Sequence, residues 1–101
     1  MSKSVTFIAP LWRFSSDAAS WYFVYTPEDF SAEVKQLVQQ KRIHTKGFGF
    51  VPVRVVVGES TWETTLFPHK KEPYLLSINK KVRLKEGIDE GDEVAVKLTL
   101  L

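Results

Sequence analysis

An alternating run of valines constrains the fold of this chain more than any other feature. Every odd position from Val51 to Val57 is valine, and in the segment 61–66 even positions hold Trp62 and Leu66. Alternation with a period of two is typical of paired strands that each bury one face. A one-residue slip would exchange the two faces, so the pattern selects a register. A two-residue loop at Gly58-Glu59 predicts the pairs Val55 with Trp62, Val53 with Thr64, Val51 with Leu66, and Arg54 with Glu63. A loop at Glu59-Ser60 would keep the same parity.

Other apolar patterns predict further strands on both sides of this hairpin. We expect strands at 5–12, 21–25, 74–76 and 94–100, with a serine-rich loop at 13–20. In the first of them, Ile8 and Trp12 lie opposite the main apolar face, so we expect both faces to be partly covered and the strand not to be a free edge. Trp62 shares the face of the valine row, which predicts a core position rather than a place in a pocket.

Two helices are predicted from their start and stop signals. The first runs from about 27 to 41, with Thr26 as N-cap, Pro27 at the first helical position and Phe30 and Val34 on its inner face. The second is short, at about 80–86, after a cap at Asn79 and before a terminating glycine at position 87. The chain is therefore mainly β with short helices, and the pattern is typical of a barrel-like fold.

Length and composition limit the organisation of the chain. Its 101 residues suit a single domain spanning 1–101, and the chain contains no cysteine, which excludes disulfides and thiolate metal sites. The start Met1-Ser2-Lys3-Ser4 carries no apolar signal core, and no apolar run is long enough to cross a bilayer. We expect an unprocessed cytoplasmic protein that does not insert into membranes.

Several segments together resemble a known family. They are Trp21–Val24, Val51–Val53, Thr61-Trp62 with Thr65–Pro68, and Gly87–Val94, in that order. These blocks resemble the bacterial domain-of-unknown-function family nineteen-oh-five.

The resemblance implies a double-split β-barrel of six or more strands, capped by the two helices and distantly like AbrB and MazE. It also implies a chain that closes its barrel alone, so we expect a monomer. Two departures are Ala19-Ser20, where members often carry two glycines, and the basic loop after Pro68. Because the family's activity is undefined, the resemblance transfers a fold and no catalytic residues. In some bacterial proteins the domain is joined to a YdeI/OmpD-associated domain, which suggests a binding module.

Residues that could carry catalysis or hold a metal do not form a set. His44 and His69 have no acidic residue at metal-ligand spacing, and Ser60 and Ser77 lie in no nucleophile elbow. Gly47 and Gly49 are not followed by the Lys-Ser/Thr of a phosphate loop. We therefore predict no catalytic residues, no metal and no cofactor, and a protein that is not an enzyme.

A basic and aromatic surface is the remaining candidate site. Its lysines and arginine follow Phe67 along the chain, and acidic residues between 86 and 93 dilute the charge. We predict a non-catalytic module that binds an anionic small ligand or a protein at one end of the barrel. An AbrB-like DNA-binding protein is the alternative, not favoured by the modest net charge of +2, and an enzyme of unknown reaction is third. The predicted binding residues are Phe67, Lys70, Lys71, Tyr74, Lys80, Lys81 and Arg83.

Overall fold

The computed structural model describes residues 3–47, 49–71 and 73–101. Predictions that involve Met1 and Ser2 at the start, and Glu72 in the basic loop, lie outside the described residues. The described part of the chain contains seven strands and two helices. In chain order they are β1 (Ser4–Pro10), β2 (Trp12–Ser15), β3 (Ser20–Tyr25), α1 (Glu28–Gln39), β4 (Val51–Val57), β5 (Ser60–Leu66), β6 (Leu75–Ser77), α2 (Lys80–Glu86) and β7 (Glu93–Leu100).

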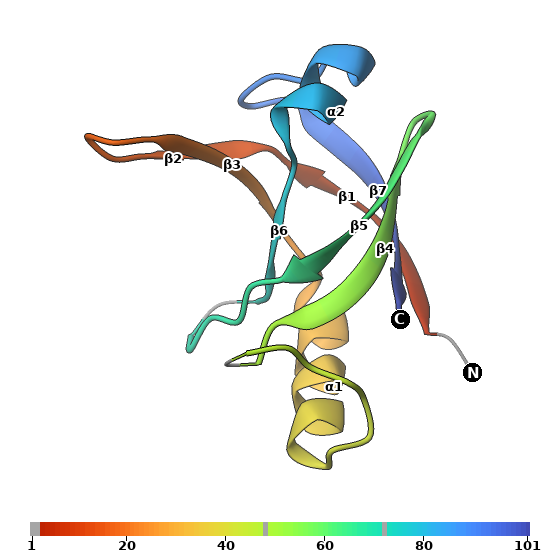
Figure 1. The fold of residues 1–101 in the computed structure, drawn as a ribbon. Coiled ribbons are helices and arrows are strands. Elements are labelled where there is room, and N and C mark those ends of the chain that lie inside the picture. Colours follow the sequence, from red (N-terminus) through yellow and green to blue (C-terminus); the bar gives the residue numbers. More distant parts are fainter. Residues whose placement is uncertain (1–2, 48, 72) are drawn as a thin grey trace.

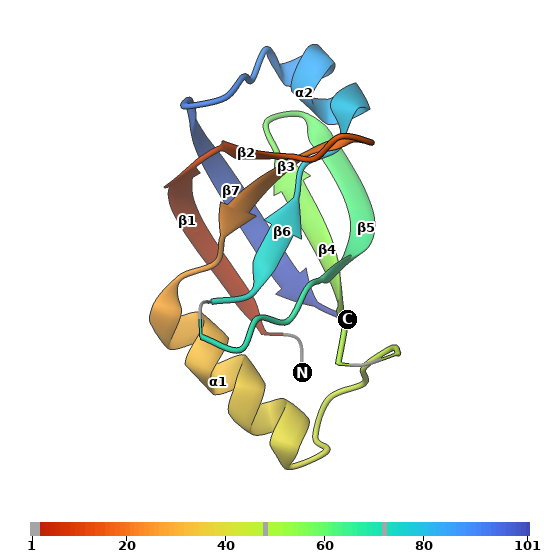
Figure 2. The same ribbon diagram turned by 90° about the vertical axis from the view of Figure 1, so that its left-hand side faces the viewer.

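The strands form two antiparallel sheets. One has the order β1-β7-β4-β5 and the other the order β2-β3-β6, and an isolated bridge between Phe67 and Leu75 links the end of β5 to β6. Figure 1 shows the β2–β3 hairpin reaching away from the body of the molecule, and Figure 2 shows α1 and α2 at opposite ends. The predicted mainly β fold with two helices is confirmed. The two sheets do not close into one ring, so the double-split barrel stays a prediction.

The central hairpin has the predicted register. Val55 pairs with Trp62, and the loop consists of Gly58 and Glu59 because Val57 pairs with Ser60. The remaining predicted pairs, Val53 with Thr64, Val51 with Leu66 and Arg54 with Glu63, are confirmed as well. On the exposed face Nη2 of Arg54 lies 3.1 Å from a carboxylate oxygen of Glu63.

The core is built from the inward faces of the two sheets and one side of each helix. The odd valines of β4 are buried, and β7 contributes Val94, Val96 and Leu98 with the predicted alternation. From the smaller sheet Val24 and Leu76 point into the same cluster. Phe30 and Val34 of α1 and Val82 of α2 close it at the two ends. A core of this kind holds the smaller sheet in place by one face only.

The start of α1 differs from the prediction. The residue before the helix is Pro27, and no side chain among the described residues caps the helix. The hydroxyl of Thr26, expected to be the cap, instead donates to the carbonyl oxygen of Tyr74 at 3.0 Å, and Thr26 is buried. The hydroxyl of Thr26, just after β3, is thus engaged in a long-range bond to the residue just before β6, and this bond ties down the segment that leads into α1.

The predicted caps of α2 are confirmed. Oδ1 of Asn79 accepts a bond from the backbone N–H of Val82 at 2.9 Å, and Gly87 ends the helix with φ of 65°. At the end of the helix, the carboxylate of Glu86 accepts bonds from Oγ of Ser60 at 2.7 Å and from the backbone N–H of Glu59 at 3.4 Å. This carboxylate ties α2 to the tip of the β4–β5 hairpin.

Two predictions near the amino-terminal end were wrong. Strand β1 pairs only with β7 and lies at a sheet edge, and Ile8 is 67% exposed. The segment 13–20 is not a loop throughout, because β2 extends to Ser15 and pairs with β3. The serines lie at the outer end of the hairpin, where the hydroxyls of Ser15 and Ser20 are hydrogen-bonded to each other across β2 and β3, so the serine content did not prevent strand pairing.

A candidate aromatic binding cleft

The outer face of the smaller sheet is covered with aromatic side chains. Strand residues alternate between faces, and the pairing of Trp12 with Phe23 and of Phe14 with Trp21 places these four on one side. Tyr25 follows on the same side, opposite Leu75 of β6. The other side carries Val24 and Leu76, which belong to the core. The aromatic face therefore points away from the core.

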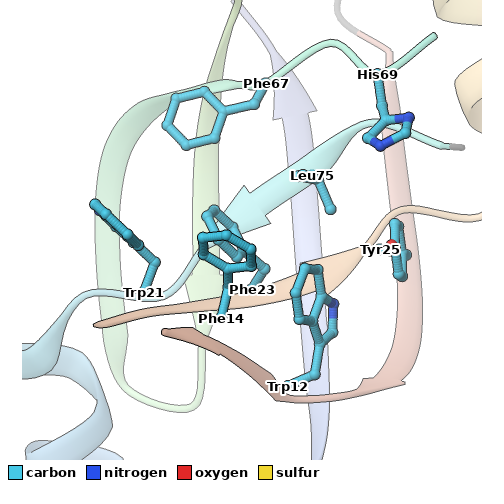
Figure 3. Close-up of a pocket in the computed structure, with 8 residues that line it drawn as sticks. All are labelled: Trp12, Phe14, Trp21, Phe23, Tyr25, Phe67, His69 and Leu75. Atoms are coloured by element: carbon cyan, nitrogen blue, oxygen red, sulfur yellow. The ribbon is translucent and has the colours of Figure 1, made fainter. Parts of the chain in front are cut away.

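These side chains form a cleft together with residues that follow β5. Its volume is about 430 Å³, within the range of about 300–1,000 Å³ that small-molecule sites occupy. Figure 3 shows the side chains arranged around it, with Trp21 and Tyr25 on opposite sides. The lining residues are Trp12, Phe14, Trp21, Phe23, Tyr25, Phe67, His69 and Leu75.

Ring contacts position the walls of the cleft. Trp12 contacts the ring of Phe23 at 5.3 Å between centroids and stacks on Tyr25 at 5.4 Å with 23° between the planes. Phe14 and Trp21 form a further pair at 5.9 Å. Rings paired in this way have less rotational freedom than isolated, exposed aromatic side chains. Yet Phe14 is 52% exposed, Trp21 42% and Tyr25 37%, so the rings keep large accessible surfaces.

Besides the rings of β2 and β3, the segment that follows β5 forms a wall of the cleft. Backbone hydrogen bonds in both directions between Phe67 and Leu75, at 2.9 and 3.0 Å, hold this segment against β6. The ring of Phe67 meets Phe23 and Phe50 edge-on, at 6.0 and 5.5 Å. Two residues further on, Nδ1 of His69 accepts a bond from the backbone N–H of Lys71 at 3.2 Å, which orients the imidazole at the rim.

Polar groups are few in this cleft. The imidazole of His69 and the phenol of Tyr25 lie at its edge, while the indole nitrogen of Trp12 is inaccessible to solvent and has no hydrogen-bond partner among the described residues. A buried N–H without an acceptor is uncommon and costs free energy. The cleft thus offers a broad apolar ring surface, and one donor without a partner is buried in its wall.

The structure separates the predicted binding residues. Phe67 lines the cleft, whereas Tyr74 lies in the core, where burial raises the pKa of its phenol above the ordinary value. Lys71 faces a different hollow beside α1, together with Glu28 and Pro73. Lys70 is exposed and next along the chain to His69.

The basic residues of α2 lie elsewhere. Lys81 borders a third hollow, between α2 and the tip of the central hairpin, and Lys80 is exposed on the same helix. The half-buried ring of Trp62 also lines this hollow, although the ring packs against the core as predicted. The guanidinium of Arg83 stacks on the ring of Tyr22 at 3.6 Å and donates to the carbonyl oxygen of Ile78 at 3.2 Å. The predicted lysines and Arg83 therefore do not gather on one concave surface.

Of the residues that line the cleft, only Phe67 was predicted from the sequence as a binding residue. A usable signal was present, because Trp12 and Phe14 alternate on one side of a short serine-rich segment and Trp21, Phe23 and Tyr25 on the other. Two aromatic alternations around a short polar connection indicate a hairpin with an aromatic face.

The described residues contain neither a candidate metal site nor a candidate membrane-spanning helix. No group of three or more histidine and acidic side chains in this part of the chain could hold a metal ion. Neither described helix has the length and apolar character needed to cross a membrane.

Comparison with known proteins places the chain in a family. A comparison with proteins of curated function found no match. The sequence model of the family described as "Domain of unknown function (DUF1905)" matches residues 7–98, which include every strand and helix that forms the cleft. The chain therefore belongs to the DUF1905 family.

Proposed function

We propose that this protein is a non-catalytic binding module that takes a flat ring system of a small molecule into the cleft of β2, β3 and β6. The observation that carries the proposal is the row of aromatic rings on the solvent side of a sheet whose other side already faces the core. In these positions the rings of Phe14, Trp21 and Tyr25 remain 37–52% exposed, so the fold buries only part of their apolar surface. They become useful when a second flat apolar surface covers them.

The shape of the cleft favours a small molecule over a protein surface. Its volume of about 430 Å³ suits a ligand of a few rings, and walls rise from both the β2–β3 hairpin and the segment at Phe67. Stacking against several rings adds an attraction beyond area burial alone. A second copy of the chain could cover this face instead of a small molecule. We propose a monomer, and sedimentation would reveal the dimer that the second copy requires.

The charge distribution favours an aromatic ligand over nucleic acid. A single strand stacked on aromatic rings also needs a basic track along its backbone. Here Lys71, Lys81 and Arg83 lie against three different parts of the surface, away from the lining of the cleft. The double-split barrel is a further part of the proposal, supported by the bridge between Phe67 and Leu75 that links the two sheets.

Binding of flat bicyclic compounds to variants of the cleft tests the proposal. Tryptophan fluorescence would report affinity for a panel of naphthalene, quinoline and indole derivatives. We expect Phe14→Ala to raise the dissociation constant of a bound compound about tenfold, the factor for one lost ring contact. Leu84→Ala is the matched control, because Leu84 is an apolar side chain, 73% exposed, on α2 and outside the cleft. Equal weakening by both variants, or dimerisation that Phe14→Ala abolishes, would contradict the proposal.

A further inference from the structure

One polar atom in the wall of the cleft has no hydrogen-bond partner among the described residues. The indole Nε1–H of Trp12 is buried and finds no acceptor among the described residues, although Trp12 lines the cleft. The indole N–H only donates hydrogen bonds, so its partner must be an acceptor atom. Water does not reach the atom, because its accessible surface is negligible.

The side chain of Tyr25 lies next to this atom. Figure 3 shows Nε1 on the side of the indole that faces Tyr25, and the two rings stack at 5.4 Å. Tyr25 is 37% exposed and lies on the outer face of β3, on the side opposite the core residue Val24. A ligand that displaces the Tyr25 ring would uncover the donor.

We infer that the ligand is a flat ring system with a hydrogen-bond acceptor on its edge, such as a ring nitrogen or a ring carbonyl oxygen. This inference rests on the proposed function and deepens it. The N–H lies in the plane of the indole, so the acceptor approaches the edge of Trp12 beside Tyr25 while the rest of the ligand covers neighbouring rings of the cleft. The ligand then supplies the partner that the fold leaves out, and the rings supply the apolar contact.

Two compounds of the same shape separate the hydrogen bond from the stacking. Naphthalene has no acceptor, and isoquinoline carries a ring nitrogen that is unprotonated above the pKa of isoquinolinium. By apolar transfer alone naphthalene is the better ligand, so a preference for isoquinoline has the opposite sign to simple partitioning. We expect isoquinoline to bind about fivefold more tightly, the factor for one net hydrogen bond.

Variants assign the preference to one donor. Trp12→Phe keeps an aromatic ring and removes the N–H, so this variant should lose the preference for isoquinoline. Trp62→Phe is the matched control, since Trp62 lies at another hollow, and should retain it. In ¹H–¹⁵N spectra the indole signal that Trp12→Phe removes should move downfield with isoquinoline and much less with naphthalene.

The possible results are distinguishable. Equal binding of the two compounds, or a preference that survives Trp12→Phe, would overturn the inference and leave the aromatic cleft as the binding site. Failure of both compounds, and of the wider panel, to bind would overturn the proposed function along with it.

Discussion

Truncating Phe14 tests whether the outer rings serve the fold. About half of this side chain is exposed, and its main ring contact is with Trp21. Full burial of a phenylalanine is worth about 1.5–3 kcal/mol, so the buried half contributes about 1 kcal/mol. The contact with Trp21 adds about 0.5 kcal/mol. No cavity forms, because the site is open to solvent. We expect Phe14→Ala to lower the free energy of unfolding by about 1.5 kcal/mol.

A core variant gives the scale for this value. Leu66 is fully buried in β5, and Leu66→Ala should cost about 2–5 kcal/mol through lost burial and a residual cavity. Urea unfolding of both variants and the wild type, followed by tryptophan fluorescence at several protein concentrations, measures the difference by linear extrapolation. A cost for Phe14→Ala as large as that for Leu66→Ala would refute the reasoning. A cost that grows with protein concentration would instead reveal a dimer on this face.

Two further variants test the packing of the fold away from the cleft. At Gly58 the backbone has φ of 56° and an added Cβ would collide with Oε1 of Glu86, so Gly58→Ala should cost about 2 kcal/mol in the wild type and about 1 kcal/mol in a Glu86→Ala background. Equal costs in a double-mutant cycle of urea midpoints would exclude this clash. Burial raises the pKa of the Tyr74 phenol, so the folded state favours its neutral form. Its contribution to stability is complete below the unfolded pKa and is lost as pH rises through the raised folded pKa. Between about pH 8 and pH 11 the wild type should therefore lose more stability than Tyr74→Phe, and identical pH profiles would contradict this.

The correctly predicted parts of the fold depend on the alternation of strand faces or on contacts between residues close in sequence. The valine row fixes which face of the central hairpin is buried, because a one-residue slip would expose Val53 and Val55. Asn79 and Gly87 bound α2 through contacts within a few residues. Thr26 failed as a cap because its hydroxyl bonds to Tyr74, which is 48 residues away and cannot be foreseen from local pattern.

The cleft could not be predicted from the same rules. In β3 both faces are apolar, with Tyr22 and Val24 on one side and Trp21 and Phe23 on the other. Only the packing of the sheet against the valine row decides which face turns inward. The predicted basic binding surface failed for a related reason. From the sequence Arg83 was expected to be an exposed cation, but in the fold it stacks on Tyr22. Charge patterns report surface exposure, and they do not report which exposed residues share a surface.

The most direct test of the aromatic cleft uses the three indole N–H signals as position markers. Trp12 and Trp21 line the cleft, while Trp62 lies at the hollow beside α2. Titration with the panel of flat bicyclic compounds should shift the signals of Trp12 and Trp21 in parallel, with one dissociation constant, and leave the signal of Trp62 in place. Shifts confined to Trp62, or no shift of any indole signal at saturating compound, would contradict the account.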